Sequence, residues 1–193
     1  MRCLIRLNEG RRLAGKDHTD MNKLYTSLPG LVVKAETSGF WLFVLNRLLN
    51  RVIPFNRPHG FSVAEIGSDH IVSTAAYKRR NFNHIKGIHA CAIATVAEFS
   101  AGFLLLARLD LQRYRLIMAR IEVEYRYQAK QRIFSKCTAS PELIESSIIE
   151  PLRHQDQVTV DMVSEISDAD GNDIARAVTT WQIKRWDRVR TGL

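Results

Sequence analysis

The chain has little cysteine and little proline, with three and five residues respectively among 193. Cys3, Cys91 and Cys137 are odd in number and far apart, which excludes a disulfide framework and a paired-cysteine metal knuckle. Cys91 lies in an apolar run, and we expect it to pack in the core as a small hydrophobe. This cysteine usage is typical of a reducing compartment, so a cytoplasmic location is expected.

Motifs for a metal or a nucleophilic serine are also missing. Asp168, Asp170 and Asn172 have the spacing that opens a calcium loop, but Asp173 stands where a glycine is needed and Thr179 where a glutamate is needed. These residues are better explained as a hairpin turn. There is no G-x-S-x-G elbow either. We therefore expect no metal and no cofactor.

The formal charge of +8 raises the question of nucleic-acid binding. The basic residues are scattered along the whole chain, however, and no recognition motif accompanies them. We therefore expect no nucleic-acid partner. A basic surface suits equally well a small ligand that carries several phosphates, by the same Coulomb attraction.

The length and the 46% hydrophobic content predict one soluble globular domain. The first 20 residues contain no apolar stretch of the length that a signal peptide needs. We divide the chain into a partly disordered N-terminal extension over 1–37, a domain over 38–187 and a tail over 188–193.

Hydrophobic periodicity and turn residues predict the elements of this domain. A helix is expected from Phe40 to Leu49, after a possible cap at Ser38, and a rigid loop over 54–60. Alternation is clearest from Leu116 to Tyr127, which predicts a strand with one covered and one wet face. Ile117, Ile121 and Val123 are among the apolar residues expected on the covered face. The other expected elements are strands over 61–66, 70–77, 132–139, 158–167 and 174–186, a long helix over 87–107 and a short helix over 142–149.

The long apolar segment from Gly87 to Ala107 carries, apart from Cys91, only two ionisable residues, His89 and Glu98. Its many alanines make it less hydrophobic than a typical lone membrane span, and strand-like, charged sequence flanks it. A helix that is apolar on every side is typical of one wrapped by a sheet. We therefore expect a core helix and no membrane partner.

Glu98 has no polar stripe around it, so a charge at this position needs a reason. The free N–H groups at the start of the same helix can polarise a carbonyl oxygen. Glu98 lies eight residues after Ala90, roughly 12 Å along a helix, so one chain cannot bring the two together. A two-fold dimer with antiparallel helices can.

The run from Asn83 to Cys91, together with Glu98, resembles the N-x-x-G-x-x-H-G-G…D/E signature of hotdog-fold thioesterases related to phenylacetyl-CoA thioesterase. The resemblance is closest to a poorly characterised branch, often described only as a domain of unknown function. It covers residues 40–187. Two positions depart from the signature: Lys86 stands where the first glycine is expected, with Gly87 beside it, and Ala90-Cys91 replaces the glycine pair.

The resemblance implies an α+β hotdog fold, in which a curved antiparallel sheet of about six strands wraps one long central helix. It implies a homodimer or dimer of dimers that binds acyl-CoA. Glu98 would be the catalytic base or nucleophile, and the Ala90 amide would hold the oxyanion. Asn83 and His89 would orient the acyl carbonyl or the attacking water. Candidate substrate-binding residues are Gly87, Ala90, Arg126, Lys130 and Arg132, the last three for the CoA phosphates.

Two other functions stay open. A non-catalytic acyl-CoA or lipid-binding protein on the same fold is favoured by the loss of the glycine pair at Ala90 and Cys91. A hotdog dehydratase is the weaker alternative, because those enzymes resemble the pattern H-x-x-P, and this chain has no proline between Pro58 and Pro141.

Overall fold

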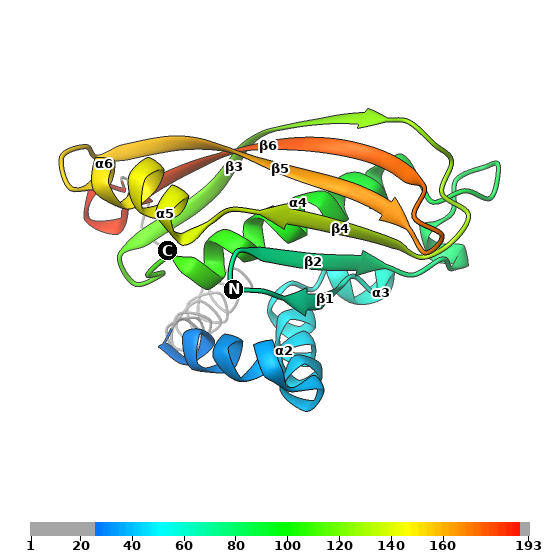
Figure 1. Ribbon diagram of the computed structural model, residues 1–193, viewed down its shortest axis with the longest axis horizontal. Helices are drawn as coiled ribbons and strands as arrows, with labels where there is room; N and C mark the ends of the chain where they lie inside the picture. The colour runs from blue at the N-terminus through cyan, green and yellow to red at the C-terminus, as the bar shows by residue number, and fades with distance from the viewer. Residues whose placement is uncertain (1–25, 190–193) are drawn as a thin grey trace, which may run out of the picture.

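A computed structural model describes residues 26–189 and has an α+β architecture. Six antiparallel strands form one sheet in the order β1-β2-β4-β5-β6-β3, and this sheet curls around the long helix α4 (Figure 1). The predicted hotdog fold is confirmed. The strands are β1 (Ser62–Ile66), β2 (His70–Ala75), β3 (Tyr114–Tyr125), β4 (Ile133–Thr138), β5 (Gln157–Asp168) and β6 (Asp173–Arg185).

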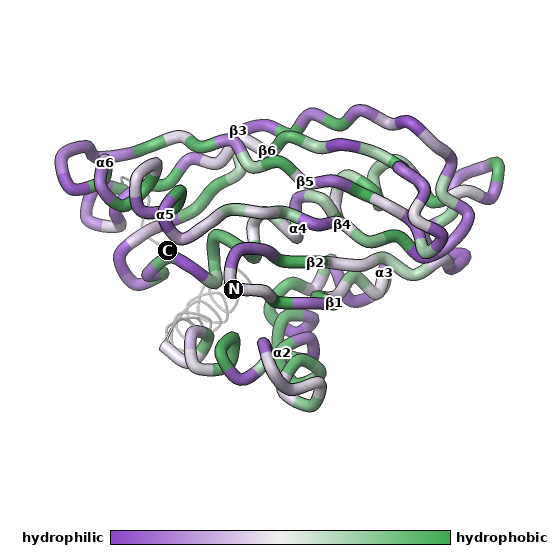
Figure 2. Tube along the Cα trace, in the orientation of Figure 1, coloured by the Kyte–Doolittle hydropathy of each residue, from purple (hydrophilic) through white to green (hydrophobic). Residues whose placement is uncertain are grey.

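Helix α4 (Ala90–Arg108) forms the centre of the core. Its apolar and small residues continue almost unbroken along the chain (Figure 2), and most of them are buried against the sheet. Among the described residues it is the one helix long and apolar enough to span a membrane. Because 61% of the most apolar stretch of α4 is buried inside the fold, the helix has the burial expected of a core helix.

A cluster of buried serines fixes α4 to the sheet. Ser100 Oγ lies 2.8 Å from Ser135 Oγ on β4 and 3.1 Å from Ser164 Oγ on β5. Ser100 also donates to the Ala97 carbonyl, and Ser73 on β2 donates to the Val96 carbonyl. These hydroxyls are buried and bonded, so they hold the register between helix and sheet without leaving an unsatisfied polar group.

The two edges of the sheet are treated differently. At the β1 edge, the Asn46 side chain of helix α2 (Gly39–Val52) bonds both the N–H and the C=O of Val63. These bonds satisfy edge backbone groups that would otherwise attract another strand. The β3 edge has no neighbouring strand among residues 26–189. Ile117 and Tyr125 on this edge are 43% and 47% exposed.

The predicted alternation of β3 is interrupted once. The β3 and β6 register shifts between Met118 and Arg120, so the apolar positions change face there. Ile117, predicted to face the covered side, is exposed. One face of β3 is therefore less completely covered than the sequence pattern indicates.

Two N-terminal helices lie beside the β1 end of the sheet (Figure 1). Residues 26–37 are helical, and their Leu28, Val32 and Ala35 belong to the core. This helix lies within the segment that we assigned to the extension, so the packed structure begins before the predicted start at residue 38. Residues 1–25, with the predicted disordered arm, and residues 190–193 of the predicted tail lie outside the described range.

Helix α2 (Gly39–Val52) confirms the predicted helix, although the Ser38 side chain makes no capping hydrogen bond. The predicted rigid loop over 54–60 contains one short helix, α3 (Asn56–His59), which ends at Gly60 in the left-handed conformation. The predicted short helix is a helical segment over 141–152, made of α5 (Pro141–Ile144), a π-helical turn (Glu145–Ile149) and α6 (Glu150–Leu152).

The turn between β5 and β6 is organised by Asp168. Its carboxylate accepts hydrogen bonds from the backbone N–H groups of Asp170 and Asn172 and from the Asn172 side chain. These bonds lower the pKa of Asp168, with the Asn172 side chain as the main cause. Asp168 is therefore engaged by its own turn, as expected for the hairpin interpretation.

Candidate active site at the start of helix α4

The first turn of α4 leaves one backbone amide without an acceptor. His89 is the N-cap residue, and its Nδ1 accepts a hydrogen bond from Cys91 N–H at 3.1 Å. The amides of Ala92 and Ile93 donate to the His89 carbonyl. Within residues 26–189, the Ala90 N–H has no such partner. This amide is therefore free to bind an oxyanion at the positive end of the helix dipole.

Asn83 shapes the loop that leads into this turn. Its Oδ1 accepts from the Gly87 amide at 2.9 Å and from the Ile85 amide at 3.1 Å. The Asn83 N–H donates to the Gly87 carbonyl. Asn83 therefore closes the loop over 83–87, and its side-chain oxygen is already used.

Lys86 is the one non-glycine residue with positive φ in the described chain, at 60°. This is the position at which the thioesterase signature has its first glycine. The left-handed backbone favoured by glycine is therefore kept here by a lysine. Tyr77 OH donates to the Lys86 carbonyl at 2.6 Å and helps to hold the turn.

Glu98 lies two turns further along α4, half-buried, and makes no hydrogen bond or ion pair with any described residue. Its carboxylate lies beside Gly102, where Trp181 of β6 also packs. Burial alone raises the pKa of Glu98. A carboxylate with a raised pKa and no partner is suited to accept a proton from water.

Cys91, Thr95 and Glu98 lie on one side of α4, because residues three and four apart are neighbours on a helix. Cys91 is exposed, and Thr95 and Glu98 are half-buried. The expectation that Cys91 packs in the core is wrong, because Cys91 lies on an exposed side of the first helical turn.

Two pockets flank the first turn. One, of about 320 Å³, is lined on the α4 side by Asn83, Ile88 and Ala90, and on the other side by the segment from Tyr125 to Ala129. The other, of about 130 Å³, is more apolar and is lined by the residues Phe55, His59, Phe61, Arg80, Asn81, Phe82, His89, Cys91, Ala92 and Thr95. The structure thus brings Asn83, Ala90 and Arg126 to one pocket and His89 to its neighbour.

The three predicted phosphate-binding residues differ in whether carboxylates already pair with them. Arg126 bonds Asp173 at 2.6 Å and Glu124 at 3.1 Å, and these carboxylates, Glu124 first, raise its pKa. Lys130 and Arg132 are exposed and form no ion pair in the described part of the chain. Lys130 and Arg132 are therefore the cations best able to meet a phosphate.

Sequence reasoning missed two residues of the site. Tyr125 OH donates to the Ala90 carbonyl at 3.0 Å, and burial, with Cys91 as a second cause, raises the pKa of Tyr125. The Gln128 side chain packs against Gly87 so closely that an added Cβ there would lie 2.9 Å from it. Tyr125 belongs to the predicted strand and Gln128 to the turn that follows it, and neither pattern gave a signal for a role at the helix start.

The described residues contain no cluster of three or more His, Cys, Asp or Glu that could hold a metal ion. Glu98 is not among the lining residues of either pocket. It lies roughly 12 Å from Ala90 along the helix. Within one chain, the free amide and the unpaired carboxylate are therefore apart.

Solved structures with the same fold include several of thioesterase type. A Pseudomonas aeruginosa protein of unknown function, described as a probable thioesterase, is 21% identical, with a TM-score of 0.68 over 74% of this chain and 94% of that one. A Chlorobaculum tepidum protein of unknown function is 12% identical, with a TM-score of 0.64 over 78% and 98%. A Haemophilus influenzae thioesterase is 13% identical, with a TM-score of 0.59 over 78% and 94%. No curated protein matches the chain.

These likenesses show the fold, a hotdog fold shared with solved proteins described as thioesterases. The family model described as "Domain of unknown function (DUF4442)" matches residues 41–183, most of the chain. The chain belongs to this family, and the predicted assignment to a branch of unknown function is confirmed.

Proposed function

We propose that this protein is an acyl-CoA thioesterase whose active sites lie between the subunits of a homodimer or a dimer of dimers. The observation that carries the proposal is the pair of unsatisfied groups on α4, the Ala90 N–H and the Glu98 carboxylate. Thioester hydrolysis needs both an oxyanion donor and a base.

Two features support a dimer. The Ala90 N–H and the Glu98 carboxylate are too far apart in one chain. A two-fold axis that sets two α4 helices antiparallel places the start of one helix beside the middle of the other. The exposed β3 edge supplies the surface for such contact, because a long unpaired edge with exposed apolar residues favours pairing with a second sheet. Glu98 lies on that side of α4, beside Trp181, whose register partner on β3 is Met118.

In the proposed reaction, Glu98 of one subunit takes a proton from a water molecule as the water oxygen attacks the thioester carbonyl carbon. The Ala90 amide of the other subunit stabilises the oxyanion that forms. The carbonyl re-forms as the C–S bond breaks, and the proton held by Glu98 passes to the CoA thiolate. The raised pKa of Glu98 favours the first transfer, because it makes the carboxylate a stronger base than an ordinary glutamate side chain.

His89 and Asn83 take supporting roles. Because His89 Nδ1 accepts the Cys91 N–H, the neutral ring carries its proton on Nε2 and can donate it toward the acyl carbonyl or the water. Asn83 acts as a positioning residue that holds the loop at Gly87 and thereby the first turn of α4. Gly87, Ala90 and the 320 Å³ pocket would receive the thioester end of the substrate.

Lys130 and Arg132 are proposed to bind the CoA phosphates. They follow the segment that lines the larger pocket, and neither is neutralised by a carboxylate in the described chain. Arg126 would contribute less, because Asp173 and Glu124 already bond its guanidinium.

The test is hydrolysis of an acyl-CoA panel of increasing chain length by the wild-type protein and by Glu98→Gln. We expect turnover for part of the panel and a loss of about 10²-fold or more in kcat for the variant, the usual contribution of a general base. Glu165→Gln, the same change at an exposed glutamate on β5, is the matched control and should keep its rate. Equal rates for Glu98→Gln and wild type would remove Glu98 from the mechanism.

A second candidate is an acyl-CoA-binding protein without hydrolysis. Ala90 and Cys91 favour it, since side chains at both positions narrow the approach of a thioester to the backbone. Thermal unfolding separates the two functions, because a ligand that binds only the folded state raises the melting temperature. A rise in Tm with acyl-CoA and no released CoA would favour binding alone.

A further inference from the structure

The outer side of α2 combines exposed aromatic side chains with arginines. Phe40, Phe43, Arg47 and Arg51 are exposed, and their spacing places them on one helical face, which we call the α2 stripe. Phe40 and Phe43 are 65% and 62% exposed. Leu45 and Leu49, on the opposite face, are buried and hold the helix to the domain.

The charge along the sequence of α2 and α3 has one sign only. From residue 37 to residue 64 the sequence contains no aspartate or glutamate. Neither Arg47 nor Arg51 forms an ion pair with a described residue. By contrast, six arginines on the sheet side of the fold each form an ion pair with a carboxylate: Arg120, Arg126, Arg153, Arg176, Arg185 and Arg188.

We propose that the α2 stripe docks the protein on an anionic phospholipid surface. Helices that lie in a membrane interface combine bulky apolar side chains with cations, which enter the acyl boundary and meet the lipid phosphates respectively. Unpaired arginines without nearby acids complement such a surface, and each cation adds to the attraction. A second copy is a poorer occupant, because it brings the same acid-free cationic face.

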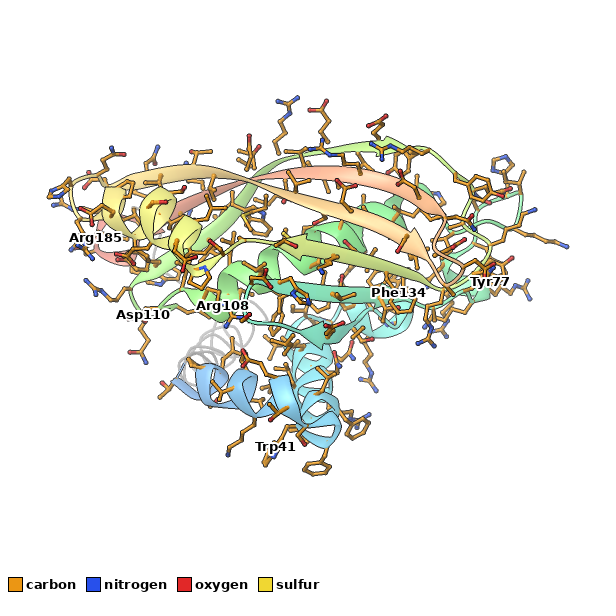
Figure 3. All side chains as sticks on the ribbon, viewed as in Figure 1. Trp41, Tyr77, Arg108, Asp110, Phe134 and Arg185 are labelled. Atoms are coloured by element: carbon orange, nitrogen blue, oxygen red, sulfur yellow. The ribbon has the colours of Figure 1, made fainter. Side chains whose placement is uncertain are left out.

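The same chemistry continues into the next segment. Phe55 is 60% exposed, and Arg57 on α3 is exposed without an ion pair in the described chain. Trp41, whose ring is covered by Lys34 at 4.7 Å, lies at the far end of the molecule from the sheet (Figure 3). The proposed docking face is thus the projecting N-terminal side of the fold.

This face connects to the start of α4. Phe55 and His59 line the 130 Å³ pocket together with His89 and Cys91. A lipid surface against α2 and α3 would therefore lie next to that pocket. Docking depends only on the exposed residues of α2 and α3, so it does not require thioester hydrolysis.

The sequence analysis argued against a helix that crosses a membrane. Surface docking needs no crossing, because the stripe lies in the interface plane with its backbone already hydrogen-bonded as a helix.

The experiment is co-sedimentation of the full-length protein with vesicles of phosphatidylcholine alone and of phosphatidylcholine with an equal amount of phosphatidylglycerol. We expect binding to the anionic vesicles only, weakened by salt. Arg47→Gln/Arg51→Gln should weaken it about thirtyfold, from the attraction of two cations near the surface. Phe40→Ser/Phe43→Ser should weaken it about tenfold or more by removing apolar burial.

The matched control is Arg153→Gln/Arg176→Gln, which removes two exposed arginines away from the α2 stripe and should change binding less than about threefold. Equal binding to neutral and anionic vesicles, or unchanged binding by both α2 variants, would overturn the proposal. A third outcome would also overturn it: α2 variants that no longer form a dimer, as measured by light scattering, but bind vesicles as the wild type does. The α2 stripe would then join two copies of the chain.

Discussion

Two sets of polar groups on α4 lie close together in the sequence and differ in their surroundings. Ser100 is fully buried and bonded to Ala97, Ser135 and Ser164. Glu98, two residues earlier, is half-buried and forms no hydrogen bond or ion pair in the described chain. The Ala90 amide also has no hydrogen-bond partner there. Bonded groups hold the helix in the sheet, whereas unbonded ones are available for chemistry.

The largest effect should come from removing the free amide. Ala90→Pro deletes the N–H at the first position of the helix, where proline is tolerated, and the extended backbone of His89 suits a following proline. We expect a loss of about 10²–10³ in kcat for acyl-CoA hydrolysis, the usual cost of one oxyanion donor, with an unchanged circular dichroism spectrum. Ala90→Gly, which keeps the amide, should stay near the wild-type rate; a similar loss there would point to a packing effect instead.

Removing a bonded group should affect stability and leave the rate alone. Ser100→Ala takes away the side-chain partner of Ser135, a buried hydroxyl on β4. We expect the free energy of unfolding in urea to fall by about 1–3 kcal/mol. Thr95→Ala removes a half-exposed hydroxyl from the same helix and should cost less than about 0.5 kcal/mol. If Ser100→Ala abolished hydrolysis at unchanged stability, the division into structural and chemical groups would be wrong.

The smallest effect concerns pH. Burial raises the pKa of Glu98, so the folded state keeps this proton at pH values where the unfolded state has lost it. The stability contributed by Glu98 is present below its unfolded pKa and is lost as the pH rises through the folded pKa. Urea unfolding over this range should show the decrease in wild type but not in Glu98→Gln, and kcat/KM should rise over the same interval. Parallel stability curves for the two proteins would contradict the assignment.

The sequence predicts the fold well where one pattern dominates. The uninterrupted apolar run predicts α4, and the alternation and turn residues predict the six strands, because burial sets their periods. The β3 bulge and the exposure of Cys91 were missed, since both depend on where the curved sheet ends relative to the helix. The cover that Asn46 provides for the β1 edge was missed for a related reason: its partner, Val63, is 17 residues away.

For the candidate site, the sequence predicts the position of each residue along the fold better than it predicts what the residue contacts. Glu98 stands out as a charge in an apolar run, and the structure gives it the half-buried, unpaired environment that this implies. Arg126 looks like a free cation in sequence, yet the fold brings Asp173 beside it from β6. Lys86 looks like a break in the motif, yet it adopts the left-handed conformation typical of glycine.

The central claim, a site shared between subunits, is tested most directly by mixing two inactive variants. Ala90→Pro and Glu98→Gln subunits are combined in equal amounts, exchanged, and assayed for acyl-CoA hydrolysis. Half of randomly assorted dimers are mixed, and each mixed dimer regains one site with both groups intact, so about a quarter of the wild-type activity should return. If each site were built from one chain, every site would carry a defect, and the absence of any recovery would contradict the account.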